Sequence, residues 1–333
     1  MSGNVSRRRA VAILASVAGL PLIPFASRPA VASETRLYQW QGFALGARSS
    51  ISLYHSDEAE AKALLADCVG EIQRLEAVLS LYRPGSALCR LNAAGRLDLP
   101  PLDLVQVLAE AQRYSVASNG AFDVTVQPLW DLYAGHFARA GADPNGPSDA
   151  AIAAAIRTID YRKVRFDTDR IEMPPGMRIT LDGIARGYAT DKVAALLRAR
   201  GMRNVLVQLD KAVALGPHAD GRPWRVGLAN PRAPDQSLKD IALVDKAVGS
   251  SGGYGTVFDP AGRFNHLFIP STGRSAHYAA QVTVVTRTGL AADALSTALS
   301  VVPRDQAAAV MRAVGGGTAY FVDDGNVITE LEA

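Results

Sequence analysis

Apolar residues recur every three to four positions between Glu58 and Leu79, which is the spacing of one helix face. The pattern predicts a long amphipathic helix that buries Leu64, Leu65, Cys68, Ile72, Leu75, Val78 and Leu79. A second helix is predicted from about Asp103 to Ser118, where Asn119-Gly120 is typical of a helix C-terminus.

Short apolar runs rich in β-branched residues predict strands in the second half of the chain, at 204–209, 224–229, 281–286 and 319–322. Helical patterns at 189–199 and 291–301 lie between or beside them. The Gly- and Pro-rich segment 138–148 predicts a surface loop, after which Ser148 would cap a short Ala-rich helix. Since strands and helices mix without strict alternation, we expect an α+β fold with mixed sheets flanked by helices.

The first 32 residues have the pattern of an export signal, and we expect residues 33–333 to form one domain. Arg7, Arg8 and Arg9 precede a 16-residue apolar run, and Ala30-Val31-Ala32 resembles a cleavage site. The paired arginines favour the twin-arginine route and a periplasmic location. A membrane span needs about 20 residues, so a retained anchor is the less favoured alternative.

The basic character of the chain belongs mostly to this leader. The 333 residues carry a net charge of +3, but without the leader's four arginines 31 basic residues face 32 acids, a net charge of −1. This balance argues against nucleic-acid binding, and no later apolar run is long enough to span a bilayer. Two cysteines, Cys68 and Cys89, cannot build a disulfide scaffold, although a single bridge between them stays open.

Common catalytic motifs are absent from the sequence, but four segments are rich in polar residues and glycine. In the first, Asp123 and Thr125 alternate with apolar residues and would share one face of a strand. In the second, Gly183 and Gly187 would let a ligand approach the backbone at a helix start, and Arg186 could pair with a phosphate. The alternative is a loop with Asp191 in the first turn of that helix.

The third segment contains two glycine-rich turns, 248–255 and 264–273, with His266 close to the second. Glycine-rich turns often only reverse the chain. In the fourth segment, Asp293 and Thr297 stand four residues apart on one helix face. Their oxygens suit a hard cation such as Mg²⁺, whereas a purely structural role would make Asp293 a helix-dipole acid.

Taken together and in order, these segments resemble the ApbE family of flavin transferases, the FAD:protein FMN transferases. The resemblance spans nearly the whole chain after the leader. It rests on Gly42–Gly46, Ser80–Ser86 with Leu91-Asn92, Gly120–Pro128, Gly183–Asp191, Ser250–Tyr254, His266–Gly273 and Asp293–Thr297.

The resemblance implies that FAD binds as a substrate and that Mg²⁺ lies on its diphosphate, held by Asp293, Thr297 and the carbonyl near Ala185. It assigns catalysis to His266 and Arg186. The residues that it places around the flavin nucleotide are Tyr82, Asn92, Asp123, Thr125, Asp182, Ser251, Gly252 and Thr272.

The implied reaction transfers FMN from FAD to a Ser or Thr hydroxyl of an acceptor flavoprotein and releases AMP. The implied acceptor is a subunit of a respiratory complex outside the cytoplasm, and some exported members accompany nitrous-oxide respiration. Two alternatives are a non-enzymatic FAD-binding maturation protein and an FAD pyrophosphatase, in which water replaces the acceptor.

This sequence also departs from the family pattern at three places around the implied flavin site. Arg186 stands where the family usually has Lys, and Asp210-Lys211-Ala212 replaces a glycine-rich acidic turn. Ile269 stands where an acid usually precedes the proline of the His266 motif. Because these departures surround the implied flavin site, we expect them to affect turnover more than the fold.

Overall fold

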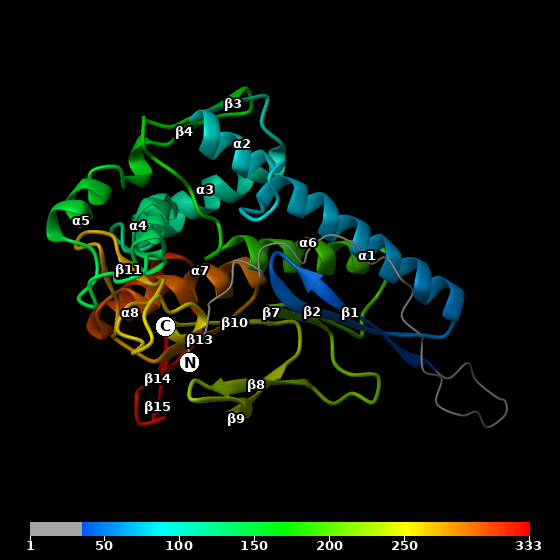
Figure 1. Ribbon diagram of the computed structural model, residues 1–333. Helices are drawn as coiled ribbons and strands as arrows, with labels where there is room; N and C mark the ends of the chain where they lie inside the picture. The colour runs from blue at the N-terminus through cyan, green and yellow to red at the C-terminus, as the bar shows by residue number, and fades with distance from the viewer. Residues whose placement is uncertain (1–34) are drawn as a thin grey trace.

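The computed structural model describes residues 35–333, so the predicted leader lies outside the described residues (Figure 1). An eight-stranded sheet forms the centre, with the strand order β1-β2-β6-β7-β10-β13-β14-β15. Every neighbouring pair in it is antiparallel. Its strands are β1 (Arg36–Ala44), β2 (Ala47–His55), β6 (Val205–Leu209), β7 (Lys211–Leu215), β10 (Ala247–Gly252), β13 (Gln281–Thr286), β14 (Thr318–Val322) and β15 (Ile328–Glu332).

Three smaller sheets accompany it within residues 35–333. They are β3 (Arg96–Asp98), β5 (Arg170–Glu172) and β4 (Arg165–Phe166); β8 (Trp224–Asn230) with β9 (Ala233–Leu243); and β11 (Phe268–Ile269) with β12 (Arg274–Ser275). The helices are α1 (Glu58–Leu79), α2 (Ala87–Ala94), α3 (Leu102–Ala117), α4 (Gln127–Phe137), α5 (Asp149–Ile156), α6 (Ala185–Ala199), α7 (Gly289–Ser300) and α8 (Ala307–Ala313). The 3₁₀ turns in the part of the chain that the structure describes are η2 (Val124–Val126), η3 (Tyr161–Lys163), η4 (Gly253–Gly255) and η5 (Arg304–Gln306).

The two faces of the central sheet are covered differently. Helices α1, α6 and α7 lie on one face, and the β8–β9 hairpin lies on the other (Figure 1). Alternating side chains of each strand point to opposite faces, so β6 sends Val207 toward the helices and Leu206 toward Trp224 of the hairpin. The α+β prediction is confirmed.

Helix α1 shows how directly the apolar pattern specifies an element. It begins after Asp57, whose side chain accepts a hydrogen bond from the backbone N–H of Glu60, and it has the predicted bounds. Cys68 is fully buried on the predicted face, and burial raises the pKa of its thiol to about 12. Cys68 and Cys89 are both free cysteines.

The other predicted elements are found with small shifts of their ends. The predicted strands correspond to β6, β8, β13 and β14, and the predicted helices to α3, α6 and α7. Residues 138–148 form no helix or strand, and the Ser148 hydroxyl caps α5 by accepting from the N–H of Ala151. Among residues 35–333, no helix is both long and apolar enough to cross a bilayer.

Candidate functional site

The candidate site lies where α6 and α7 meet on the helical face of the sheet. The two helices approach so closely that a Cβ on Gly187 would lie 2.2 Å from the carbonyl oxygen of Gly289. The backbone N–H of Gly187 donates a 2.9 Å hydrogen bond to Asp293 Oδ2. A glycine at this position therefore lets a carboxylate of α7 bond directly to the backbone of α6.

Asp293 and Thr297 lie on one face of α7, as predicted. This face meets the start of α6 and the residues before it. Asp293 is 1% exposed, and Thr297 Oγ1 lies 3.2 Å from Ser251 Oγ, which also contacts Ser296 Oγ at 2.9 Å. A Cβ on Gly183 would lie 3.1 Å from Thr297 Oγ1. Ala185 therefore lies between Gly183, which faces Thr297, and Gly187, which bonds to Asp293.

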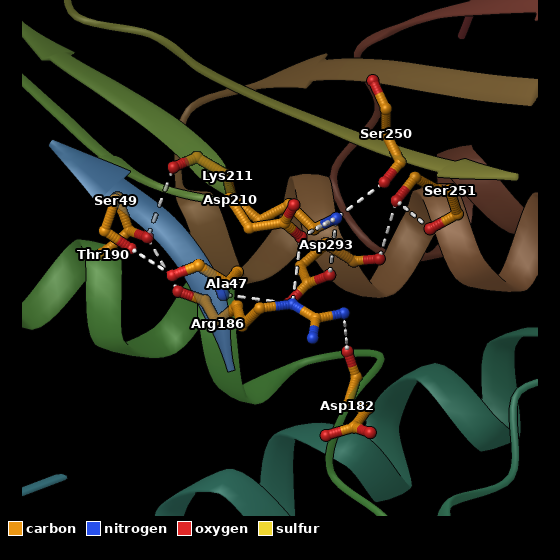
Figure 2. Close-up of polar contacts among 12 residues, drawn as sticks. Ala47, Ser49, Asp182, Arg186, Thr190, Asp210, Lys211, Ser250, Ser251 and Asp293 are labelled. Carbon is orange, nitrogen blue, oxygen red and sulfur yellow. Dashed lines mark hydrogen bonds and ion pairs between the residues drawn. The ribbon is translucent and has the colours of Figure 1, made fainter. Parts of the chain in front are cut away.

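Figure 2 shows two cations and two carboxylates meeting beside α7. Lys211 Nζ lies 2.6 Å from the carbonyl oxygen of Ser250, 3.0 Å from Asp210 Oδ2 and 3.5 Å from Asp293 Oδ1. Arg186 Nε lies 3.0 Å from the same Asp210 oxygen. Asp210 thus bridges the two cations, and its backbone at φ +70° forms the turn between β6 and β7.

Burial and charge act in opposite directions in this cluster. Burial raises the pKa of Asp293 above the ordinary carboxyl value, although Lys211 and Arg186 act to lower it. At Asp210 burial is outweighed by Lys211 and Arg186, which hold its pKa below the ordinary value. Burial also opposes the charge of Arg186, but Asp210 and Asp182 raise the pKa of the guanidinium, which stays charged.

The segment before α6 is held in place by hydrogen bonds from two sides. The Asn92 side chain donates to the carbonyl of Ile179 and accepts from its N–H, both at 2.7 Å. Tyr82, which is 53% exposed, donates its hydroxyl to Asp182 Oδ2 at 2.7 Å, and Arg186 donates to the Asp182 carbonyl at 3.0 Å. Asn92 thus orients the backbone that leads into Asp182 and Arg186.

His266 follows the turn after η4, and its Nδ1 lies 3.3 Å from the carbonyl oxygen of Thr256. Burial lowers the pKa of its imidazole, the bond to Thr256 acts to raise it, and Arg186 lowers it further. The neutral form of the ring, which can accept a proton, is therefore favoured.

The prediction that Asp123 and Thr125 lie on a strand is wrong. Val124–Val126 forms the 3₁₀ turn η2, and Asp123 caps it by accepting from the N–H and the hydroxyl of Thr125. The other Asp123 oxygen accepts from the N–H of Tyr161. Alternation over so few residues does not distinguish a strand from a capped turn. Both side chains are buried, and their hydrogen bonds stabilise the local backbone.

The predicted role of the two glycines also needs correction. We expected these glycines to let a ligand approach the backbone. The structure shows instead that they let α6 approach α7, with Gly289 next to Gly187 and Thr297 next to Gly183. Asp191 does not lie in the first turn of α6, because that helix begins at Ala185. Asp191 accepts hydrogen bonds from the N–H groups of Gly289 and Leu290 and so caps α7.

The remaining predicted residues, Gly252 and Thr272, lie at turns. Gly252 ends β10, and a Cβ there would meet the Tyr254 ring at 2.4 Å and the Ala280 carbonyl oxygen at 2.8 Å. Thr272 is exposed in the β11–β12 turn, where its hydroxyl accepts from the N–H of Arg274. Within residues 35–333 its hydrogen bonds reach none of the other predicted site residues.

Sequence reasoning missed the position of Lys211, which the structure places at the centre of the charged cluster with 3% of its side chain exposed. The available signal was a lysine at the start of an otherwise apolar strand, Lys211–Leu215. A cavity of about 870 Å³ lies elsewhere, near Arg113, Tyr114, Lys192 and Thr288, and contains none of the predicted site residues. Among residues 35–333, no group of three or more His, Cys, Asp or Glu side chains is arranged to hold a metal.

Comparisons with known proteins identify the family of the chain and its fold. The model of the ApbE family matches residues 45–322. An FAD:protein FMN transferase of Klebsiella pneumoniae is 30% identical over 295 residues, covering 85% of this chain and 84% of that protein. One of Haemophilus influenzae is 28% identical over 301 residues, covering 84% and 85%.

Solved structures with the same fold include the Pseudomonas stutzeri flavinyl transferase ApbE in its apo form. It superposes with a TM-score of 0.73 at 29% identity and covers 89% of this chain and 96% of that one. The flavin transferase ApbE from Vibrio cholerae superposes with a TM-score of 0.76 at 25% identity, covering 90% and 97%.

Proposed function

Because the chain belongs to the ApbE family, we propose that it transfers FMN from FAD to a Ser or Thr hydroxyl of an acceptor protein and releases AMP. The observation that carries the proposal is the buried cluster at the α6–α7 contact. It combines a carboxylate, a hydroxyl and a guanidinium, which are the groups that a diphosphate and its cation need.

The residues beside α7 fit a magnesium ion. Asp293 Oδ1 is buried and, among residues 35–333, has no hydrogen bond of acceptable geometry. Mg²⁺ prefers oxygen ligands and often keeps few from the protein when substrate phosphates supply others. Asp293, the Thr297 hydroxyl and the Ala185 carbonyl would hold the ion, which would neutralise charge on the diphosphate.

Arg186 would hold the phosphoryl group that moves. In the proposed step the acceptor oxygen forms a bond to the phosphorus of the FMN half, and the bond from that phosphorus to the bridging oxygen breaks. The leaving group is AMP, which keeps the bridging oxygen. A guanidinium stabilises charge on the phosphate oxygens in such a step, and Asp210 and Asp182 keep Arg186 oriented and charged.

His266 would accept the proton of the acceptor hydroxyl. A general base must be neutral before it acts, and burial lowers the pKa of this imidazole. Tyr82 presents a half-exposed ring beside Asp182, which suits the flat flavin ring. The remaining predicted residues, Asn92, Asp123, Thr125, Gly252 and Thr272, would act by shaping the backbone around the nucleotide.

We further propose that the enzyme acts in the periplasm after export by the twin-arginine route, on a flavoprotein subunit of a respiratory complex. The support is the arginine-rich start of the chain with its apolar run and Ala-Val-Ala site. An acceptor from nitrous-oxide respiration is one form of this proposal. Mass spectrometry of the periplasmic protein would test the cleavage after Ala32.

Purified protein incubated with FAD, Mg²⁺ and an acceptor peptide tests the reaction. AMP is measured by chromatography and the peptide adduct by mass. We expect equal amounts of AMP and FMN adduct, and AMP without acceptor would instead indicate hydrolysis. Asp293→Asn should lose most of the activity, while Asp324→Asn on an exposed turn should keep it. No adduct with any divalent metal would refute the proposal.

A further inference from the structure

Lys211 is a buried cation at the position where a divalent metal would be needed. Its side chain is 3% exposed, and its ammonium faces three oxygens, those of the Ser250 carbonyl, Asp210 and Asp293, at 2.6, 3.0 and 3.5 Å. The oxygens of Ser250 and Asp210 lie at hydrogen-bond distance from the ammonium, whereas Asp293 Oδ1 makes a longer ion-pair contact with it. The lysine is therefore held mainly by Ser250 and Asp210, and Asp293 Oδ1 is left with a charge contact alone.

The charges of the cluster balance only because Lys211 is present. Asp210 and Asp293 contribute two negative charges, and Arg186 and Lys211 contribute two positive ones. Without Lys211 the cluster would carry one excess negative charge, and the nearly inaccessible Asp293 would lose its nearest cation. A buried carboxylate without a partner is strongly unfavourable, so such a site would attract a cation.

Lys211 and a metal would use the same oxygen of Asp293. Asp293 Oδ2 already accepts the N–H of Gly187, which leaves Oδ1 for a second partner. Oδ1 is the atom that Lys211 Nζ faces. Two cations at one oxygen repel each other, so the ammonium and the metal oppose each other's binding.

We propose that Lys211 is a built-in counter-ion of Asp293 that competes with the divalent metal, so that metal binds firmly only when FAD brings its own phosphate charges. This rests on the proposed function for the metal ligands and goes beyond it. The free protein then keeps Asp293 neutralised by Lys211, and the added negative charge of the diphosphate lets the site hold both cations. Metal and FAD consequently bind cooperatively.

Replacing Lys211 with methionine keeps an unbranched side chain one atom shorter and removes its charge. The test is titration of full-length protein with Mn²⁺, both without and with FAD, monitored by calorimetry. Thermal unfolding is also compared with and without metal. We expect Lys211→Met to bind Mn²⁺ at least ten-fold more tightly than the wild type. We also expect it to unfold at a lower temperature without metal and to regain most of the loss with metal.

Lys239→Met is the matched control, because Lys239 is partly exposed, pairs with Glu330 and lies on β9, on the face of the sheet opposite α7. It should leave Mn²⁺ affinity unchanged. If Lys211→Met does not fold, adding Asp293→Asn removes the uncompensated charge and should restore folding without restoring metal binding. Failure of this double variant to fold would count against the counter-ion role.

The proposal is overturned if Lys211→Met binds Mn²⁺ no more tightly than the wild type, or if the wild type binds it equally well with and without FAD. These measurements need no acceptor and no turnover. Loss of the proposed FMN transfer would therefore leave the Mn²⁺ comparison of the free proteins intact, and the two proposals can fail separately.

Discussion

Gly187→Ala should separate α6 from α7, although alanine is the better helix former. A Cβ at this position would lie 2.2 Å from the Gly289 carbonyl oxygen, 2.6 Å from its carbonyl carbon and 2.7 Å from Asp293 Cβ. Two of these atoms are backbone and cannot rotate away. Relief of the overlap therefore requires a movement of one helix relative to the other by roughly 1 Å, the shortfall from ordinary contact distance.

The change in the free energy of unfolding caused by Gly187→Ala has three contributions. Alanine gains about 1 kcal/mol of helix propensity over glycine. Overpacking costs about 1 to 3 kcal/mol, and weakening the bond from the Gly187 N–H to the buried Asp293 carboxylate costs about 1.5 to 3 kcal/mol. The net loss is about 1.5 to 5 kcal/mol, which for a chain of this size lowers the unfolding temperature by roughly 2 to 8 °C.

Gly70→Ala in α1 is the matched control, because Gly70 lies inside a helix and a Cβ there would meet nothing within 4 Å. It should raise stability by about 0.5 to 1 kcal/mol. Urea and thermal unfolding of both variants decide the matter. A Gly187→Ala protein as stable as the wild type would show that the helices are not in the close contact described.

Three further predictions concern single side chains. Native protein at pH 8 should leave Cys68 unmodified by a thiol reagent, since its pKa is raised to about 12, and labelling at the rate of an unfolded control would contradict this burial. The acid limb of the pH profile of FMN transfer should have its midpoint below pH 6.5, because neutral His266 is lost only as the pH falls through its lowered pKa. A midpoint above pH 6.5, or one that is unchanged in His266→Gln, argues against His266 as the base. Asp123→Ala should cost about 3 kcal/mol in urea unfolding by removing the acceptor of three hydrogen bonds, and a change below 1 kcal/mol would refute the capping role.

Elements with a clear apolar period could be predicted closely. The α1 helix has its predicted bounds because a buried stripe repeats over 22 residues, which leaves little freedom in where the pattern starts and stops. Asp293 and Thr297 share a helix face because their spacing alone decides that. Local patterns therefore gave the correct face for the two proposed metal ligands.

Contacts between distant parts of the chain could not be read from the sequence. Asp191 caps α7 through residues 98 and 99 positions later, so it looked like a first-turn acid of its own helix. Gly187 looked like a ligand-binding glycine because its neighbour, Gly289, is equally remote. Lys211 resembled a turn cation until the fold placed it against Asp293.

The order of strands in the central sheet has a consequence for synthesis of the chain. Strand β2 pairs with β6, so Leu53 cannot pair until Val205, about 150 residues later in the chain, has been synthesised. At about 5 to 20 residues per second this takes roughly 8 to 30 s, during which the β2 edge of the β1–β2 hairpin stays unpaired. The period in which the nascent chain needs protection from aggregation is therefore set by where β6 is encoded.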